Sequence, residues 1–238
     1  HITGGGGEMG PASRTPEMSV SALVAAGITT VVGVTGTDSV SRSLENLLTK
    51  ARALTQDGLT AYLWTGAYRV PTPTLTGTVS RDICLIEQCI GVGEIAVGDH
   101  RGSQPTVHDL EMLASECRVG GMLANKAGVV HVHMGHNPGG LLELRAAVQQ
   151  SALPITAFYP THMSRNKELV DEGARWIKEG GYVDFTARSR DTISALTRYF
   201  ASGVNLEHVT VSSDAGGSFP SFDEAGNLVR YRMLDASC

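Results

Sequence analysis

The sequence has no long hydrophobic run and no cluster of basic residues, and each absence excludes a class of protein. No apolar stretch approaches the ~18 residues of a membrane-spanning helix, so no membrane span is predicted. The 238 residues carry 19 Lys and Arg against 24 Asp and Glu, a formal net charge of −5. Without a run of Lys or Arg, the chain has no electrostatic footprint for nucleic acid or an anionic membrane, and neither is expected as a partner.

Paired cysteine spacing is also absent. The four cysteines, Cys84, Cys89, Cys117 and Cys238, include no CxxC pair, which argues against a zinc ribbon or a disulfide scaffold and suits free thiols in a reducing compartment. The chain opens HITGGGGEMG, with no initiator Met and without the basic and then apolar segments of a signal peptide. We therefore expect a cytoplasmic protein and a chain that is a fragment of a longer one.

Strand-like and helix-like segments alternate along the chain. Strands, most of them apolar on both faces as in a buried parallel sheet, are expected at Ile28–Thr35, Leu59–Thr65, Ile90–Val97, Val129–Met134, Pro154–Tyr159, Tyr182–Thr186 and His208–Ser213. Helices are expected from the N-cap Thr15 to about Gly27 and at Ser41–Thr55, Val107–Ala124, Gly140–Ser151, Asn166–Glu179 and Asp191–Ser202. The long, proline-containing connection Ala67–Thr78 is a candidate active-site loop.

This alternation, without a linker or a shift in composition, predicts an α/β fold: one (β/α)8 barrel over residues 1–238 that lacks its first strand. A doubly wound open sheet is the rival arrangement. Against it, no GxGxxG motif follows the early strands, and polar residues recur at the ends of many strands rather than at one switch point.

Polar residues stand where apolar strands end. His133, His162 and Asp214 lie at or just after the ends of three predicted strands, Glu94 interrupts a fourth, and His1 precedes a glycine-rich loop. Barrel enzymes gather residues from different strand ends at one rim. A buried carboxylate without a partner would cost several kcal/mol, and a His, Asp and Glu set predicts a divalent metal site. Zinc is favoured, with manganese, cobalt or iron as alternatives.

Several of these positions also have an ordinary structural explanation. His131, deeper in its strand than His133, is expected to be a packed or supporting histidine. Asp214 also suits capping the turn before Ala215, and Gly4–Gly7 also suits a flexible turn. The combination of residues, more than any one of them, favours a metal hydrolase.

A series of longer motifs runs through nearly the whole chain: HITGGGGEMGPASRTPE, GVTGTDSVSR, TGAYRVPTPTLTG, GEIAVGDHRGSQP, VHMG, PTHMSRN, KEGGYVDFT and VSSDAGGSFP. In this order they resemble the bacterial isoaspartyl (β-aspartyl) dipeptidases of the amidohydrolase superfamily. The resemblance implies a TIM-type barrel of the metal-dependent amidohydrolase kind. It also implies a small flanking β-domain, absent from this stretch, and a homo-oligomeric full-length protein.

The resemblance further implies two divalent metal ions, with zinc as the expected metal. His1 resembles the second histidine of the family's HxH motif, and His133 and His162 resemble the pair that holds the second metal. Asp214 resembles the aspartate after the eighth strand, a metal ligand and proton shuttle. Glu94 departs from the family pattern, because many members carry there a carboxylated lysine that bridges both metals. A glutamate supplies a bridging carboxylate without that modification.

A substrate-binding set is implied in the same way. Glu8 resembles the carboxylate that receives the substrate's free α-amino group, and Tyr68 resembles the phenol that polarises the scissile carbonyl. Arg101 and Arg165 resemble the pair that holds a substrate carboxylate, a task that guanidinium forks suit. A backbone group and two hydroxyls complete the implied set: Gly6, Thr37 and Ser218.

The implied protein is a metallo-dipeptidase of the omega peptidase type. It would hydrolyse the isopeptide bond of a β-aspartyl dipeptide, a small-molecule substrate, by a metal-bridging hydroxide, with Asp214 and Tyr68 as catalytic residues. Two alternatives stay open. One is another amidohydrolase, such as a D-aminoacylase or a cyclic-amide hydrolase, against which a receptor for a free amine at Glu8 argues. The other is a non-catalytic metal-binding barrel, against which the presence of Asp214 argues.

Overall fold

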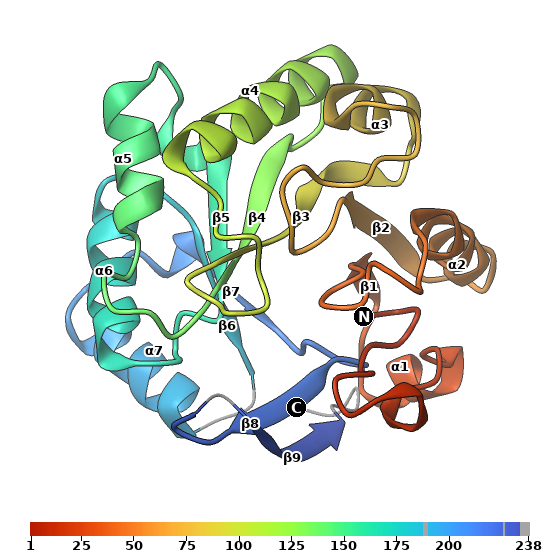
Figure 1. Cartoon of the computed structure of the whole chain (residues 1–238). Helices are drawn as coiled ribbons and strands as arrows, with labels where there is room; N and C mark the ends of the chain where they lie inside the picture. Colours follow the sequence, from red (N-terminus) through yellow and green to blue (C-terminus); the bar gives the residue numbers. More distant parts are fainter. Residues whose placement is uncertain (188–189, 226, 234–238) are drawn as a thin grey trace.

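The computed structural model describes residues 1–187, 190–225 and 227–233. Five parallel strands form one sheet in chain order: β1 (Thr30–Gly33), β2 (Thr60–Thr65), β3 (Cys89–Val97), β4 (Val129–Met134) and β5 (Phe158–Thr161). A parallel pair, β6 (Val183–Thr186) and β7 (Val209–Ser212), follows, and then an antiparallel hairpin of β8 (Ser218–Phe222) and β9 (Leu228–Met233). Figure 1 shows the parallel strands curling around a common centre.

The helices between the strands lie on the outer side of the curled sheet (Figure 1). They are α1 (Val20–Ala25), α2 (Leu44–Gln56), α3 (Val79–Leu85), α4 (Val107–Ala124), α5 (Leu142–Gln150), α6 (Lys167–Lys178) and α7 (Arg190–Ala201), with short 3-10 turns η1 (Pro11–Ser13), η2 (Ile155–Ala157) and η3 (Leu206–His208). No helix among the described residues is both long and apolar enough to cross a membrane.

Most of these helices begin at a residue whose side chain caps the first turn. The helix faces that contact the sheet form the core. The Thr106 hydroxyl and the Asp109 carboxylate form a capping box at the start of α4, and Asn166 accepts a hydrogen bond from the third residue of α6. Between helices and sheet lie fully buried side chains such as Leu47, Phe158 and Trp176. Leu47 and Trp176 pack helices α2 and α6 against the sheet in this way.

The structure confirms the mixed α/β class and places a strand in each predicted strand segment. β4 and α4 have the predicted bounds. The sequential order of the five-stranded sheet has no reversal, which excludes a doubly wound arrangement for these strands. β5 begins later than predicted, because the residues after Pro154 form the turn η2. The short helix α3 and the β8–β9 hairpin were not predicted. The predicted thiols of Cys84, Cys89 and Cys117 are free, and Cys238 lies outside the described residues.

The predicted start of the first helix at Thr15 is wrong. The helix α1 begins at Val20 with Ser19 as its N-cap. The buried Thr15 hydroxyl instead accepts a hydrogen bond from the Gly5 backbone N–H (2.6 Å) and donates to the carbonyl oxygen of Gly216 (3.0 Å). The hydroxyl is therefore used to join the N-terminal loop to the segment after β7.

The glycine-rich N-terminal loop is held by backbone pairing. The Gly5 N–H donates to the Gly216 carbonyl (2.8 Å), and the backbone nitrogen of His1 donates to the Ala215 carbonyl (2.9 Å). Gly4 has a φ of +75°, and a Cβ there would lie 2.4 Å from the Thr15 carbonyl oxygen, so a side chain does not fit. This pairing brings His1 next to the end of β7.

A buried carboxylate anchors the long Ala67–Thr78 connection. Asp82, with no exposed surface, accepts hydrogen bonds from the Thr65 hydroxyl (2.5 Å) and from the backbone N–H groups of Leu75 (2.8 Å) and Thr76 (2.7 Å). The Thr76 hydroxyl is a fourth donor at 2.7 Å. Each carboxylate oxygen therefore has two donors, and the connection is tied to the end of β2.

We predict that Asp82→Asn lowers the free energy of unfolding by about 1–3 kcal/mol, because an amide nitrogen would replace an acceptor among buried donors. Urea unfolding of the full-length gene product measures the change. Asp57→Asn, at the exposed C-terminal cap of α2, is the matched control and should stay within ~0.5 kcal/mol of the wild type. Equal stability of the two variants would show that Asp82 contributes nothing.

Candidate active site

A cavity of about 720 Å³ lies at the carboxyl ends of the strands. The sequence-predicted site residues line it, except Glu94, which is buried with 3% of its surface exposed. The residues of this set that line the cavity are His1, Gly6, Glu8, Thr37, Tyr68, Arg101, His133, His162, Arg165, Asp214 and Ser218. The fold thus brings side chains from both ends of the sequence to one place.

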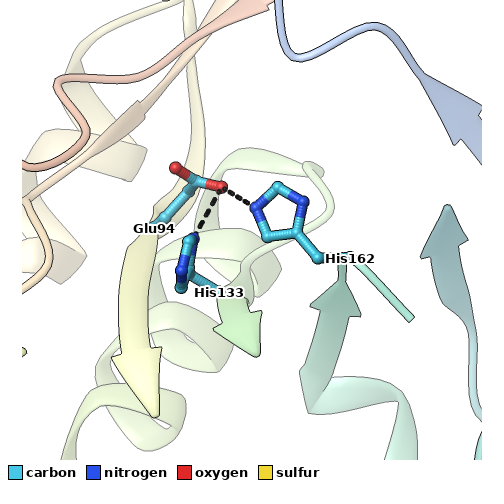
Figure 2. Close-up of side chains that lie close together, drawn as sticks. All are labelled: Glu94, His133 and His162. Carbon is cyan, nitrogen blue, oxygen red and sulfur yellow. Dashed lines mark ion pairs between the residues drawn. The ribbon is translucent and has the colours of Figure 1, made fainter. Parts of the chain in front are cut away.

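Glu94 faces histidines with both of its carboxylate oxygens. Oε1 lies 3.3 Å from His162 Nε2 and 3.8 Å from His133 Nδ1, and Figure 2 shows both contacts meeting at this one oxygen. Oε2 lies 4.0 Å from His1 Nε2. The carboxylate therefore stands between two separate groups of side chains.

An irregularity in β3 directs Glu94 into this position. Between Val92 and Ile95, which keep regular partners on β4, Gly93 and Glu94 stand opposite the single residue His131. Such a bulge bends a strand and re-aims a side chain. A Cβ on Gly93 would lie 2.7 Å from the His131 carbonyl oxygen, so the glycine is needed for the close approach of the two strands.

His162 and Asp214 have left-handed backbone conformations, with φ of +64° and +53°. Non-glycine residues in this region cost about 1–3 kcal/mol and cluster at functional sites. Asp214 Oδ1 lies 3.1 Å from His1 Nε2. The alternative prediction, that Asp214 caps the following turn, is not supported, because Ser213 accepts the hydrogen bond from the Ala215 N–H (3.3 Å).

Burial and neighbouring charges set the protonation states. Burial alone would raise the pKa of Glu94, but its two histidine neighbours outweigh that effect and hold the pKa well below its usual value. Burial, aided by the Arg165 cation, lowers the pKa of His162 to about 4. Burial opposes charge on His1 and Asp214 as well, yet their ion pair raises the pKa of His1 and lowers that of Asp214. Both carboxylates are therefore ionised at neutral pH, and His162 is neutral, as metal ligation requires.

The two ring nitrogens of His133 have different partners. Nδ1 lies 2.7 Å from the Tyr68 hydroxyl. Nε2 lies 3.0 Å from Asp99 Oδ2 and 2.9 Å from Arg165 Nη1. Burial raises the pKa of Tyr68 well above its usual value, so its hydroxyl keeps its proton and is a hydrogen-bond donor.

One carboxylate oxygen of Glu8 accepts a hydrogen bond and the other has no hydrogen-bond partner among the described residues. Ser218 donates a hydrogen bond to Oε1 (2.6 Å), and Arg101 Nη1 lies 3.7 Å from the same oxygen. Oε2 is buried and has no hydrogen-bond partner among the described residues. Because an unpaired buried acceptor is costly, this oxygen is suited to receiving a cationic donor from a ligand.

The donor set fits a divalent metal ion. Glu94, His133 and His162 each offer one ligand atom, and the three atoms lie within 4.8 Å of one another. Glu94 Oε2 and His1 Nδ1 are buried without a hydrogen-bond partner among the described residues. Imidazole and carboxylate together are the ligands of zinc and related ions.

Two residues that the sequence analysis did not single out contact the predicted ligands. Asp99 contacts His133, and the Thr186 hydroxyl lies 2.6 Å from His162 Nδ1. Thr186 ends β6 and Asp99 comes two residues after β3, so the same strand-end rule would have selected both. His131 is packed as expected, with its ring stacked 5.2 Å from that of Trp64.

Solved structures provide the comparison, since no protein-family model matches the chain. The crystal structure of a β-aspartyl dipeptidase from Fervidobacterium islandicum AW-1 in complex with β-Asp-Leu dipeptide has a TM-score of 0.95 and 46% identity, and the match covers 99% of this chain and 62% of that one. A second structure of a β-aspartyl dipeptidase from that organism has a TM-score of 0.88 and 47% identity, over 91% of this chain and 60% of that one.

A more distant similarity concerns the fold alone. An amidohydrolase from Mycoplasma synoviae has a TM-score of 0.57 and 16% identity, over 82% of this chain and 63% of that one. The chain thus spans less than two thirds of the length of each of these proteins.

We predict that Glu94→Gln lowers the metal bound per full-length chain at least about two-fold, because an amide loses the charge that lies between the two groups of candidate ligands. Elemental analysis after dialysis measures the content, and circular dichroism checks that the variant is folded. Glu87→Gln, a substitution in the turn between α3 and β3, is the control with unchanged metal content. Unchanged metal in Glu94→Gln would place the bridging group elsewhere.

Proposed function

The chain belongs, over the stretch it covers, to the β-aspartyl dipeptidase family of the amidohydrolase superfamily, and on this premise we propose that its protein hydrolyses the isopeptide bond of β-aspartyl dipeptides. One observation carries the proposal. The cavity lined by the candidate ligands His133 and His162 is also lined by two arginines and by Glu8, whose Oε2 is unpaired, so candidate receptors for both charged ends of a small zwitterion lie beside the candidate metal ligands.

The site residues divide into two groups around Glu94. In our proposal His133 and His162 would hold one divalent ion, His1 and Asp214 would hold a second, and the Glu94 carboxylate would be shared between the two groups. Such ions, with zinc expected, supply Lewis acidity toward a carbonyl oxygen and lower the pKa of a water molecule. The two oxygens of Glu94, each directed at a different group, support this division.

Glu8 is proposed to receive the substrate's α-ammonium group. Oε1 already accepts a hydrogen bond from the Ser218 hydroxyl, whereas the buried Oε2 has no hydrogen-bond partner among the described residues. An ammonium group there would gain a charge-assisted hydrogen bond and would satisfy the unpaired oxygen. Gly6 and Thr37 line the same cavity as Glu8. A cyclic neutral amide would leave Glu8 unsatisfied, which favours a dipeptide over the substrate of a cyclic-amide hydrolase.

Tyr68 and Asp214 are proposed to handle charge and protons during the reaction. The raised pKa of Tyr68 keeps its hydroxyl proton available for donation to the carbonyl oxygen as negative charge develops there. The ion pair with His1 keeps Asp214 ionised. Its carboxylate can therefore accept a proton from the attacking water and deliver it to the leaving amine.

The arginines are proposed to fix the substrate by its carboxylate. Arg101 and Arg165 both line the cavity, and Arg165 Nη1 reaches the His133 ring at 2.9 Å. Holding both charged ends places the isopeptide carbonyl next to the candidate metal ligands. Peptides that are extended or blocked at either end are therefore expected to be poor substrates.

Membership of this family also bears on the predicted barrel. We propose that the curled sheet is part of a (β/α)8 barrel, with residues 1–238 as a fragment of that barrel without its first strand and without the flanking β-domain. The likeness to a distant amidohydrolase supports the barrel class. Assembly into a homo-oligomer and a cytoplasmic location stay predictions.

The substrate assignment is tested with isomeric dipeptides. Metal-loaded, full-length protein should cleave β-Asp-Leu with a kcat/KM at least ~100-fold above that for α-Asp-Leu, because the shorter α-linked backbone cannot satisfy both end receptors at once. Release of free leucine measures both rates. Equal rates for the two isomers would refute the assignment.

Glu8→Gln should reduce kcat/KM for β-Asp-Leu at least ~100-fold while leaving metal content unchanged, because the amide retains an acceptor for Ser218 but removes the charge that receives the ammonium group. Steady-state kinetics and elemental analysis give the two readouts. Wild-type kinetics in this variant would assign the amine receptor to another residue.

A further inference from the structure

Asp99 lies between the candidate metal ligands and the proposed substrate receptor. It comes two residues after β3 and is buried, with 6% of its surface exposed. Oδ2 lies 3.0 Å from His133 Nε2 and accepts a hydrogen bond from Arg101 Nη2 (2.7 Å). Oδ1 accepts from Arg101 Nε (3.0 Å) and from the Arg101 backbone N–H (2.9 Å). One carboxylate thus holds a histidine and a guanidinium at once.

The contact with Asp99 determines which nitrogen of His133 carries the proton. An ionised carboxylate only accepts hydrogen bonds, so the 3.0 Å contact requires a proton on Nε2. Nδ1 then carries the in-plane lone pair of the ring, and this is the nitrogen that lies 3.8 Å from Glu94 Oε1. The protonated Tyr68 hydroxyl, 2.7 Å from Nδ1, donates to the same lone pair, so the contacts on both sides of the ring agree.

The nearby Arg165 does not reverse this assignment. Its Nη1 lies 2.9 Å from His133 Nε2 but also donates to the carbonyl oxygen of Met134 (2.5 Å). A neutral Nε2 that accepted from Arg165 would direct its lone pair at a carboxylate oxygen 3.0 Å away. The repulsion in a buried site disfavours that state.

On the other side, Asp99 fixes the orientation of Arg101. The Nε and Nη2 edge of the guanidinium is taken up by Asp99 in a bidentate pair. The remaining Nη1 lies 3.7 Å from Glu8 Oε1, and the guanidinium carbon lies 5.7 Å from the centre of the Tyr68 ring. Arg101 lines the cavity, and its Nη1 is not used by the pair with Asp99.

We propose that Asp99 is a positioning residue that couples the two halves of the site. Through His133 it selects the ring nitrogen offered to the metal, and through Arg101 it fixes the guanidinium that holds the substrate carboxylate. The second half of this proposal rests on the proposed function, whereas the first depends only on metal binding. Outer contacts of this kind are commonly as important to a metal site as the ligands themselves.

The test compares Asp99→Asn with Glu172→Gln in the full-length protein. Glu172 on α6 accepts a hydrogen bond from Arg145 Nε (2.7 Å) and does not line the cavity. Its variant therefore also neutralises a carboxylate that is paired with an arginine, but away from the site. Zinc affinity is measured by competition with a chelator in the absence of substrate, and KM and kcat are measured with β-Asp-Leu.

Asp99→Asn should weaken the binding of one zinc ion by about 10–100-fold and raise the KM for β-Asp-Leu about 10-fold. Glu172→Gln should leave the zinc affinity and the KM unchanged. Zinc affinity or KM equal to that of the control would overturn the coupling. Failure of the wild type to cleave β-Asp-Leu would refute the proposed function, yet the zinc measurement would still decide the role of Asp99 toward His133.

A second measurement does not depend on the folding of the variant. In metal-free wild type labelled with 15N-histidine, the NMR signals of His133 should show a protonated Nε2 and an unprotonated Nδ1. A proton on Nδ1 would overturn the proposal.

Discussion

The burial of the Glu94 carboxylate among imidazoles is the constraint on which the rest of the site depends. An ionised carboxylate removed from water costs several kcal/mol unless charged or hydrogen-bonding groups replace the solvent. Here four histidines from different parts of the chain lie within 4.0 Å of its oxygens: His1, His131, His133 and His162. The bulge in β3, the left-handed backbone at His162 and the docking of the N-terminal loop each serve to bring one of these partners within 4 Å.

A second buried carboxylate shows what a different set of partners does. Asp184 on β6 accepts hydrogen bonds from the hydroxyls of Thr161 on β5 (2.6 Å), Thr210 (2.5 Å) and Ser212 (2.6 Å) on β7. Hydroxyls carry no charge, so burial dominates and raises the pKa of Asp184, whereas the imidazoles lower that of Glu94. Asp184 therefore joins three strands, and Glu94 is held ready for a cation.

Much of the site could be predicted because parallel strands end at one rim. His133 lies near the end of an apolar strand, and His162 and Asp214 follow two others, so topology alone brings such residues together. The N-terminal segment was harder to predict. Thr15 has the local pattern of a helix start, but a contact with a residue 201 positions away decides its conformation, and local propensity carries no information about that contact. Asp99 also follows a strand end and meets the same rule, but the sequence does not reveal which two neighbours its carboxylate joins.

The pairing of the N-terminal loop with the segment after β7 affects the order in which parts of the site form. The backbone nitrogen of His1 donates to a carbonyl oxygen 214 positions along the chain, so this contact closes a very long loop. Loops of this length close late, after local contacts have formed. During synthesis the Glu94, His133 and His162 group can assemble before the His1 and Asp214 group exists. The two groups of side chains around Glu94 therefore form in an order set by the chain.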